Sequence, residues 1–238
     1  MERLAAGASK LGLELTPQQL EQFQVYYQEL VNWNRRLNLT AITDYEEVQV
    51  KHFLDSLTVV LALRQPPSKC MRLIDVGTGA GIPGIPLKIL SPDIQLVLLD
   101  ATKKKASFLE HIVHRLGLKD VEIVVGRAEE IAHQPEYRED FDLVLSRAVA
   151  NLPVLVELTL PFCTVGGRFI AQKKGDLEAE VQAAQQAIFL TGGELTDVKR
   201  IELPEFADER CLVVINKVKE TPPQYPRRPG VPAKRPLR

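Results

Sequence analysis

A glycine-rich segment between a predicted strand and a predicted helix constrains this chain more than any other feature. Residues 73–84 read Leu-Ile-Asp-Val-Gly-Thr-Gly-Ala-Gly-Ile-Pro-Gly, and either Pro83 or Pro86 could begin the helix. Glycines at the carboxyl end of a strand let the backbone approach a ligand closely. The alternative is a tight strand-to-helix turn that binds nothing, and the segment alone does not separate the two.

The rest of the chain alternates between strand and helix patterns, which predicts an α/β fold. Short apolar runs recur at residues 72–76, 95–99, 121–125, 141–145, 168–171, 195–203 and 211–216. Helical patterns between the first six runs favour a parallel sheet with helices on both faces. Residues 204–210 are too short for a crossover helix, so we expect a seven-stranded, mostly parallel sheet with an antiparallel last strand.

Two flanking segments differ from this central pattern. Residues 1–66 have helical spacing, with capping patterns at Thr16 and Asp44, and predict a helical extension packed on a main domain of residues 67–218. After Glu220 the chain holds six prolines and five Lys/Arg, so we expect residues 219–238 to form a disordered basic tail. Such a tail either contacts phosphates or only increases solubility.

Composition argues against several classes of protein. The 238 residues carry a net charge of −1, include no apolar run long enough to cross a membrane, and do not begin with a signal peptide. Three separated cysteines (Cys70, Cys163 and Cys211) without a CxxC pair indicate neither disulfides nor a zinc site. We therefore expect a cytoplasmic protein without a metal, and a monomer.

Carboxylates after three successive strands indicate which ligand the glycine loop would hold. Asp75 lies two residues before Gly77, Asp100 ends the second strand and Glu129 follows the third. An acid at Asp100 can accept from both ribose hydroxyls, as NAD and S-adenosylmethionine (SAM) each require. An acid at Asp75 can reach the methionine ammonium, and one at Glu129 can help to read adenine. Together they favour a class I SAM-dependent methyltransferase (Rossmann-like) fold, although each alone could cap a helix.

The loop after the fourth strand indicates the kind of methyl acceptor. It reads Leu145-Ser146-Arg147-Ala148 and has no Asn/Asp-Pro-Pro-aromatic motif, which would serve an exocyclic amine. It also lacks the Pro-Cys pair that attacks cytosine C5, and Cys163 lies among apolar residues typical of a core. These absences point to a ring nitrogen or another intrinsically nucleophilic atom.

A set of short segments carries a family resemblance over about residues 10–217. They are Asn32–Asn34, Asn38–Thr40, Lys51–Ser56, Ile74–Pro86 and Ser146–Ala148. In these segments the chain resembles the RsmG (GidB) family of bacterial small-subunit ribosomal RNA methyltransferases. The resemblance implies a SAM-dependent enzyme that methylates N7 of one guanine in 16S rRNA. Because the chain without its basic end has a net charge of −7, we expect the substrate to be an assembled 30S particle.

The strand-end acids and the resemblance together give a set of expected site residues. The expected cofactor contacts are Asp75, Gly77, Gly79, Ile82, Asp100, Ala101, Thr102, Ala128, Glu129 and Arg147. The expected positioning residues toward the acceptor are Arg147, Lys173, His52 and Asn38. The register of Lys173 against Lys174 stays open. Structural alternatives also remain: Arg147 could pair with Asp55, His52 and Asp55 could join the helical segment to the main fold, and Asn38 could shape a turn.

Three other functions remain compatible with the sequence. The same fold could methylate a small molecule, which would require a closed acceptor pocket. It could also sense SAM or dock RNA without chemistry, shown by tight SAM binding without turnover. An NAD-dependent dehydrogenase would instead bind nicotinamide.

Overall fold

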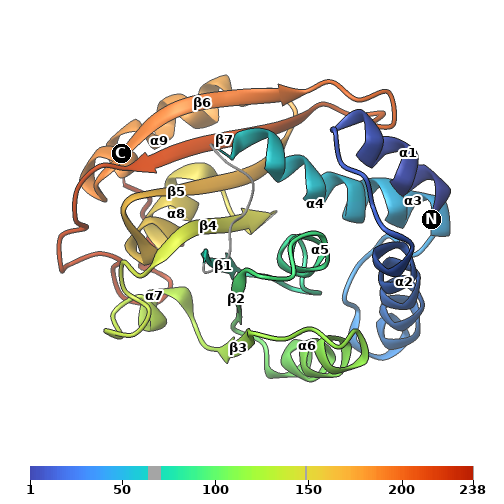
Figure 1. Cartoon of the computed structure of the whole chain (residues 1–238). Helices are drawn as coiled ribbons and strands as arrows, with labels where there is room; N and C mark the ends of the chain where they lie inside the picture. The colour runs from blue at the N-terminus through green and yellow to red at the C-terminus, as the bar shows by residue number, and fades with distance from the viewer. Residues whose placement is uncertain (64–70, 148, 238) are drawn as a thin grey trace.

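The computed structural model describes residues 1–63, 71–147 and 149–237. Its centre is a seven-stranded sheet with helices against both faces (Figure 1). The predicted boundary between residues 66 and 67 lies outside the described residues, as do Cys70 and Ala148.

The sheet confirms the predicted mixed topology. Its strands are β1 (Arg72–Val76), β2 (Gln95–Asp100), β3 (Val121–Val125), β4 (Phe141–Arg147), β5 (Cys163–Lys174), β6 (Gly193–Ile201) and β7 (Arg210–Lys217). Their order is β3-β2-β1-β4-β5-β7-β6, with β1 to β5 parallel and β7 antiparallel to both of its neighbours. The direction of winding reverses between β1 and β4. Ligands of such sheets bind beyond the carboxyl ends of the strands near this reversal.

Strand side chains alternate between two apolar cores, one on each face. Leu73, Leu96 and Leu98 belong to the first core, whereas Ile74 and Val97 belong to the second. This period of two follows from the pleat. The first core contains residues of the N-terminal helices, α5 (Gly84–Leu90) and α6 (Lys103–Arg115), and the second contains residues of α8 (Leu152–Thr159) and α9 (Glu178–Leu190).

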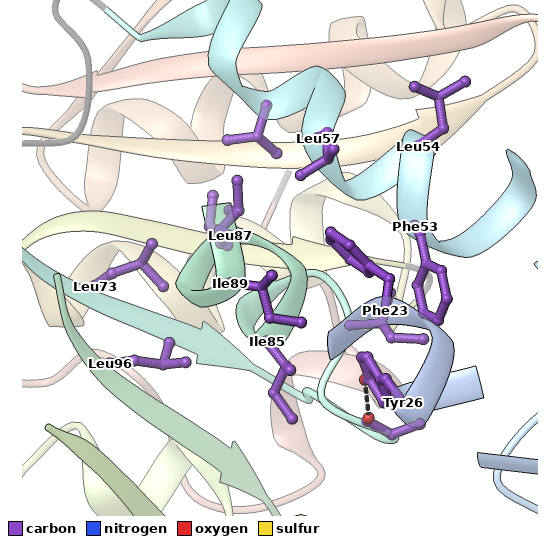
Figure 2. Close-up of a cluster of buried hydrophobic side chains, with 14 of the residues drawn as sticks. Phe23, Tyr26, Phe53, Leu54, Leu57, Leu73, Ile85, Leu87, Ile89 and Leu96 are labelled. Carbon is purple, nitrogen blue, oxygen red and sulfur yellow. Dashed lines mark hydrogen bonds between the residues drawn. The ribbon is translucent and has the colours of Figure 1, made fainter. Parts of the chain in front are cut away.

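The predicted helical extension packs on the first core. Figure 2 shows Phe23, Tyr26 and Phe53 gathered beside α5, with the Tyr26 hydroxyl donating to the Ala80 carbonyl of the glycine loop. The extension therefore contacts the loop at the carboxyl edge of the sheet. Its elements are α1 (Glu2–Lys10), α2 (Pro17–Leu37), α3 (Tyr45–Val48), η1 (Gln49–Leu54), α4 (Asp55–Leu57) and η2 (Thr58–Ala62).

The helix predicted after Asp44 begins as expected but is not continuous. The Asp44 carboxylate accepts the Glu47 amide at 2.9 Å, which confirms the cap. Residues 49–54 then widen into a π-helix, and residues 58–62 tighten into a 3₁₀ helix. Buried side chains throughout this segment, such as Phe53, show that tertiary packing overrides the local helical period here.

The C-terminal segment, residues 219–237, is ordered in the structure, contrary to the expected disordered tail. Pro226 and Pro232 are buried, and a short helix, α10, forms at Val231–Lys234. Composition alone predicts disorder because proline and charge supply little core. Contacts with residues far away in the sequence, such as the ion pair of Arg227 with Glu157, supply the missing stabilisation.

Candidate functional site

The glycine loop follows β1 in a conformation that only glycine adopts easily. Gly77 has φ +74°, and its amide donates to Leu99 O of β2 at 2.8 Å. A Cβ built on Gly77 would lie 2.5 Å from Cγ2 of Val149, in the loop after β4. The loop after β1 and the loop after β4 therefore touch each other at the point where the sheet reverses direction.

A pocket of about 160 Å³ opens beside this loop, at the ends of β1, β2 and β3. The structure brings five of the expected cofactor residues to it: Gly77, Asp100, Ala101, Ala128 and Glu129. Val76, Leu99, Gly126, Arg127, Val149 and Leu158 complete its lining. Carboxylates at one end and backbone at the other suit a ligand with several hydrogen-bond donors.

The Asp100 carboxylate is held by backbone amides of the glycine loop and of the turn after β2. Its Oδ1 accepts the Thr102 amide at 2.9 Å, and its Oδ2 accepts the Gly79 amide at 3.0 Å. The Lys105 ammonium lies 3.3 Å from the same Oδ2. Gly79 and Thr102 therefore support the carboxylate without lining the pocket themselves. Oδ1 accepts only one of these bonds, so its second lone pair can still accept from a ligand hydroxyl.

Asp75 is enclosed by protein. Its Oδ2 accepts the Thr78 hydroxyl at 2.7 Å and the Gly84 amide at 2.9 Å, so it joins the glycine loop to the start of α5. Its buried Oδ1 has no partner among the described residues. Burial raises the pKa of Asp75 to about 6. Ile82, another expected contact, is a buried member of the first apolar core.

Glu129 connects the pocket to the C-terminal segment. Its Oε1 accepts the Arg127 guanidinium at 2.9 Å and the Gly230 amide at 3.0 Å. Burial favours the neutral acid, but these two bonds outweigh it and hold the pKa of Glu129 below its usual value. This carboxylate is therefore an anion at neutral pH.

A second, basic pocket lies at the same edge of the sheet, at β4, β5 and the start of β7. Its volume is about 370 Å³. It contains three expected positioning residues, His52, Arg147 and Lys173, so Arg147 lines this pocket and not the first one. Its other lining residues are Ile42, Lys51, Asp55, Gln172, Lys174 and Arg210.

Arg147 is held by the helical extension. Its guanidinium donates to Asp55 Oδ2 at 3.0 Å, to Lys51 O at 3.0 Å and to His52 Nδ1 at 3.1 Å. The ion pair with Asp55 that the sequence left as an alternative is thus present. It does not exclude a ligand, because Arg147 still lines the pocket.

His52 is a neutral imidazole in this network. A guanidinium can only donate, so its contact with Nδ1 assigns that nitrogen as the acceptor and places the ring proton on Nε2, 2.8 Å from Oγ1 of Thr40. Nδ1 also lies 3.2 Å from Lys51 O, but that carbonyl already accepts from Arg147. Burial and the nearby Arg147 lower the pKa of His52 to about 3. The pair of His52 and Asp55 does join the helical extension to β4.

Two buried polar atoms in the basic pocket have no partner among the described residues. They are Oε1 of Gln172, an acceptor, and Nη2 of Arg210, a donor. Both residues line the pocket. Sequence reasoning missed them because neither belongs to a motif. The sequence feature that could have identified Arg210 is the predicted antiparallel last strand. Such a strand starts at the edge where the parallel strands end, so its first residue lies beside the pocket.

Asn38 and Lys173, the remaining expected positioning residues, make contacts that shape the fold. Asn38 is exposed and ends α2 in the left-handed region with φ 49°, outside both pockets. Lys173 donates to Ala150 O at 2.8 Å and pairs with Glu180 at 2.5 Å, so it fixes the loop after β4. Lys174, in contrast, is half exposed and pairs with Asp208.

Over residues 1–63, 71–147 and 149–237, no group of three or more His, Cys, Asp or Glu side chains is placed to hold a metal ion. In that same portion, no helix is long and apolar enough to span a membrane.

Solved structures share the fold at low sequence identity. A SAM-dependent methyltransferase from Aquifex aeolicus aligns with a TM-score of 0.51 at 16% identity, covering 72% of this chain and 93% of that one. TYW2 from M. jannaschii in complex with AdoMet aligns with a TM-score of 0.53 at 13% identity, covering 69% of this chain and 77% of that one. This likeness confirms the predicted class I methyltransferase fold.

Sequence relatives are far closer. "Ribosomal RNA small subunit methyltransferase G" of Dehalococcoides mccartyi (strain CBDB1) is 55% identical, and that of Roseiflexus castenholzii is 48% identical; each alignment covers 100% of both chains. The model of the family described as "GidB: rRNA small subunit methyltransferase G" matches residues 19–210. The chain therefore belongs to the GidB family of rRNA small subunit methyltransferases, as its sequence motifs predict.

Proposed function

We propose that this protein transfers a methyl group from SAM to N7 of one guanine in 16S rRNA within the small ribosomal subunit. The observation that carries the proposal is that one edge of the sheet holds two pockets. They are the pocket lined by Asp100 and Glu129, called the acidic pocket or cofactor pocket below, and the basic pocket. Arg147 lines the basic pocket and Val149, two residues later, lines the acidic one. A methyl donor and a nucleic-acid acceptor would meet across this loop.

The acidic pocket suits the nucleoside half of SAM. Asp100 would accept from the ribose hydroxyls, and Glu129, which lines the same pocket, would help to bind the adenine. Gly77 lets the loop after β1 lie against Val149 of the loop after β4, because a Cβ at this position would collide with that side chain. The unpartnered Oδ1 of Asp75 faces no protein donor, and the methionine ammonium is a donor of suitable chemistry. When bound, the cofactor supplies an electrophilic methyl on a positively charged sulfur.

The basic pocket suits a guanine. An unpaired guanine offers O6 as an acceptor beside N1–H as a donor, and Nη2 of Arg210 with Oε1 of Gln172 offers the complementary pair. These contacts would use the pairing edge of the base. They leave N7, on the other edge, free to react. Lys51 and Lys174 at the mouth could receive the neighbouring phosphates.

The chemistry requires alignment more than proton transfer. N7 carries an in-plane lone pair and no proton, so attack forms the N7–CH₃ bond and breaks the S–CH₃ bond without a general base. Positive charge moves from sulfur to the purine. The neutral state of His52 fits this requirement, since it adds no charge next to the forming cation. Holding both ligands in line lowers the activation barrier, and such alignment is worth at most about 7–11 kcal/mol in enzymes generally.

The test is methyl transfer to 30S subunits prepared from cells that lack this protein. Incubation with labelled SAM should place the label in N7-methylguanine of 16S rRNA, and protein-free 16S rRNA should accept much less. Gln172→Leu should lower kcat/KM at least tenfold while SAM affinity changes little; the melting temperature should fall, because the bond from Nε2 of Gln172 to Asp55 O is also lost. Label in another nucleoside, or in an RNase-resistant small molecule, would refute the proposal. We further propose that the protein acts in the cytoplasm and as a monomer.

A further inference from the structure

The C-terminal segment is fastened to the body over most of its length. The Arg138 guanidinium donates to Thr221 O at 2.8 Å and to Tyr225 O at 3.0 Å, and His133 Nε2 lies 2.8 Å from Pro226 O. The Thr221 amide donates to Glu139 at 2.6 Å. Figure 1 shows this part of the chain, in red, passing beside α7 (Ala128–Ile131) and α8. Its backbone is therefore held at several points.

The strongest attachment is an ion pair in the second core. Glu157 of α8 is fully buried, and it accepts from Arg227 three times: from the backbone amide at 2.9 Å, from Nε at 2.8 Å and from Nη2 at 2.6 Å. A buried carboxylate requires such a partner. One of the cations of the segment is thus neutralised, and its position along α8 is fixed.

A second attachment places the segment at the rim of the cofactor pocket. The Gly230 amide donates to Glu129, whose side chain lines that pocket. The nearby residues Arg228 and Val231 are therefore held at the rim of this pocket, on the side of Glu129. A disordered tail would not have this fixed relation.

Three cations of the segment are left without partners. Arg228, Lys234 and Arg235 are exposed, and in the portion of the chain that the structure describes their side chains form no ion pair or hydrogen bond. From Thr221 to Leu237 the sequence contains no acid. The formal charge of residues 221–237 is +4, and three of these charges remain after Arg227 pairs with Glu157, whereas the whole chain has a net charge of −1. Because the backbone that carries them is already held, binding would cost mainly the rotamer entropy of the three side chains and little backbone entropy.

We propose that Arg228, Lys234 and Arg235 form an RNA-binding surface that contacts phosphates of the substrate rRNA beside the cofactor pocket. This inference rests on the proposed function and extends it from the pocket to the surface around it. Charge favours a polyanion, and the segment has none of the exposed large apolar side chains that the core of a protein interface uses. Backbone phosphates, read by charge alone, match this chemistry.

The experiment compares two variants of the full chain. The first is Arg228→Gln/Lys234→Gln/Arg235→Gln. The control is Lys119→Gln, an exposed lysine just before β3, at the opposite edge of the sheet. Binding to undermethylated 30S subunits and to protein-free 16S rRNA is measured between 50 and 300 mM KCl, roughly the range where counterion release dominates. SAM affinity and melting temperature are measured alongside.

The triple variant should bind both the particles and the RNA more weakly, with the slope of log affinity against log salt smaller by about 2, near 0.7 per lost contact. Lys119→Gln should match the wild type, and SAM affinity should be unchanged. An unchanged slope would overturn the inference. So would a loss of particle binding with normal binding to free rRNA, which would indicate a ribosomal protein as the partner. Failure of the proposed function would be seen separately, as absent N7 methylation by the wild type.

Discussion

The neutral, buried His52 predicts a specific dependence of stability on pH. Its pKa is about 3 in the folded protein, against about 6.5 in an unfolded chain. A depressed folded pKa means that the contribution to stability is complete above about pH 6.5 and is lost as the pH falls, because only the unfolded state takes up the proton. Between pH 7 and pH 5 the loss from this one residue is about 2 kcal/mol.

Protonation of Asp75 raises the free energy of unfolding over the same pH range in which the His52 contribution is lost. Its folded pKa is about 6, above the usual value of a free aspartate, so the folded state takes up the extra proton and gains about 1 kcal/mol between pH 7 and pH 5. The wild-type profile therefore conceals part of the His52 effect. A comparison of variant with wild type removes the Asp75 contribution from both.

The measurement is urea unfolding of His52→Asn and of the wild type at pH 5, 6 and 7, followed by the fluorescence of Trp33, the single tryptophan. The unfolding free energy of the variant should fall by about 2 kcal/mol less than that of the wild type from pH 7 to pH 5. His114→Asn, which removes an exposed histidine of α6, is the control and should follow the wild type. If His52→Asn runs parallel to the wild type, His52 is not held neutral and the assigned Arg147 hydrogen bond is wrong.

Three further predictions concern the cofactor pocket and the C-terminal segment. Asp100→Asn should weaken SAM binding about tenfold in calorimetry, because the ribose loses a charged acceptor; unchanged affinity would contradict its placement. Gly77→Ala should cost about 2 kcal/mol of unfolding free energy, and adding Val149→Ala should restore part of this, whereas equal losses would refute the clash. Arg227→Gln should cost about 3 kcal/mol in urea unfolding by leaving Glu157 buried and unpaired; a loss under about 1 kcal/mol would mean that the pair does not hold the segment.

The sequence predicts the sheet well because strand signals are local. Apolar runs such as 121–125 coincide with the strand, and the runs that differ do so by a few residues at their ends. The acidic pocket is predictable for a related reason. Asp100 is the last residue of β2 and Glu129 comes four residues after β3, and parallel strands bring their carboxyl ends to one edge.

The basic pocket and the C-terminal segment depend on contacts between distant parts of the chain. Arg210 enters the pocket because β7 inserts between β5 and β6, a pairing that no local pattern specifies. The C-terminal segment looks disordered by composition, yet Glu157 and Arg138, more than 60 residues away, hold it in place. The basic character of the segment, in contrast, is evident from the sequence alone.

The loop after β4 is the part of the site on which both halves depend. Arg147 is tied to the helical extension through Asp55, while Lys173 of β5 holds the far end of the loop through Ala150 O. Val149, between these two attachments, contacts the glycine loop. Because methyl transfer needs the two ligands in line, a loop clamped at both ends fixes their relative position before either binds. The buried ion pairs around it thus serve geometry rather than stability alone.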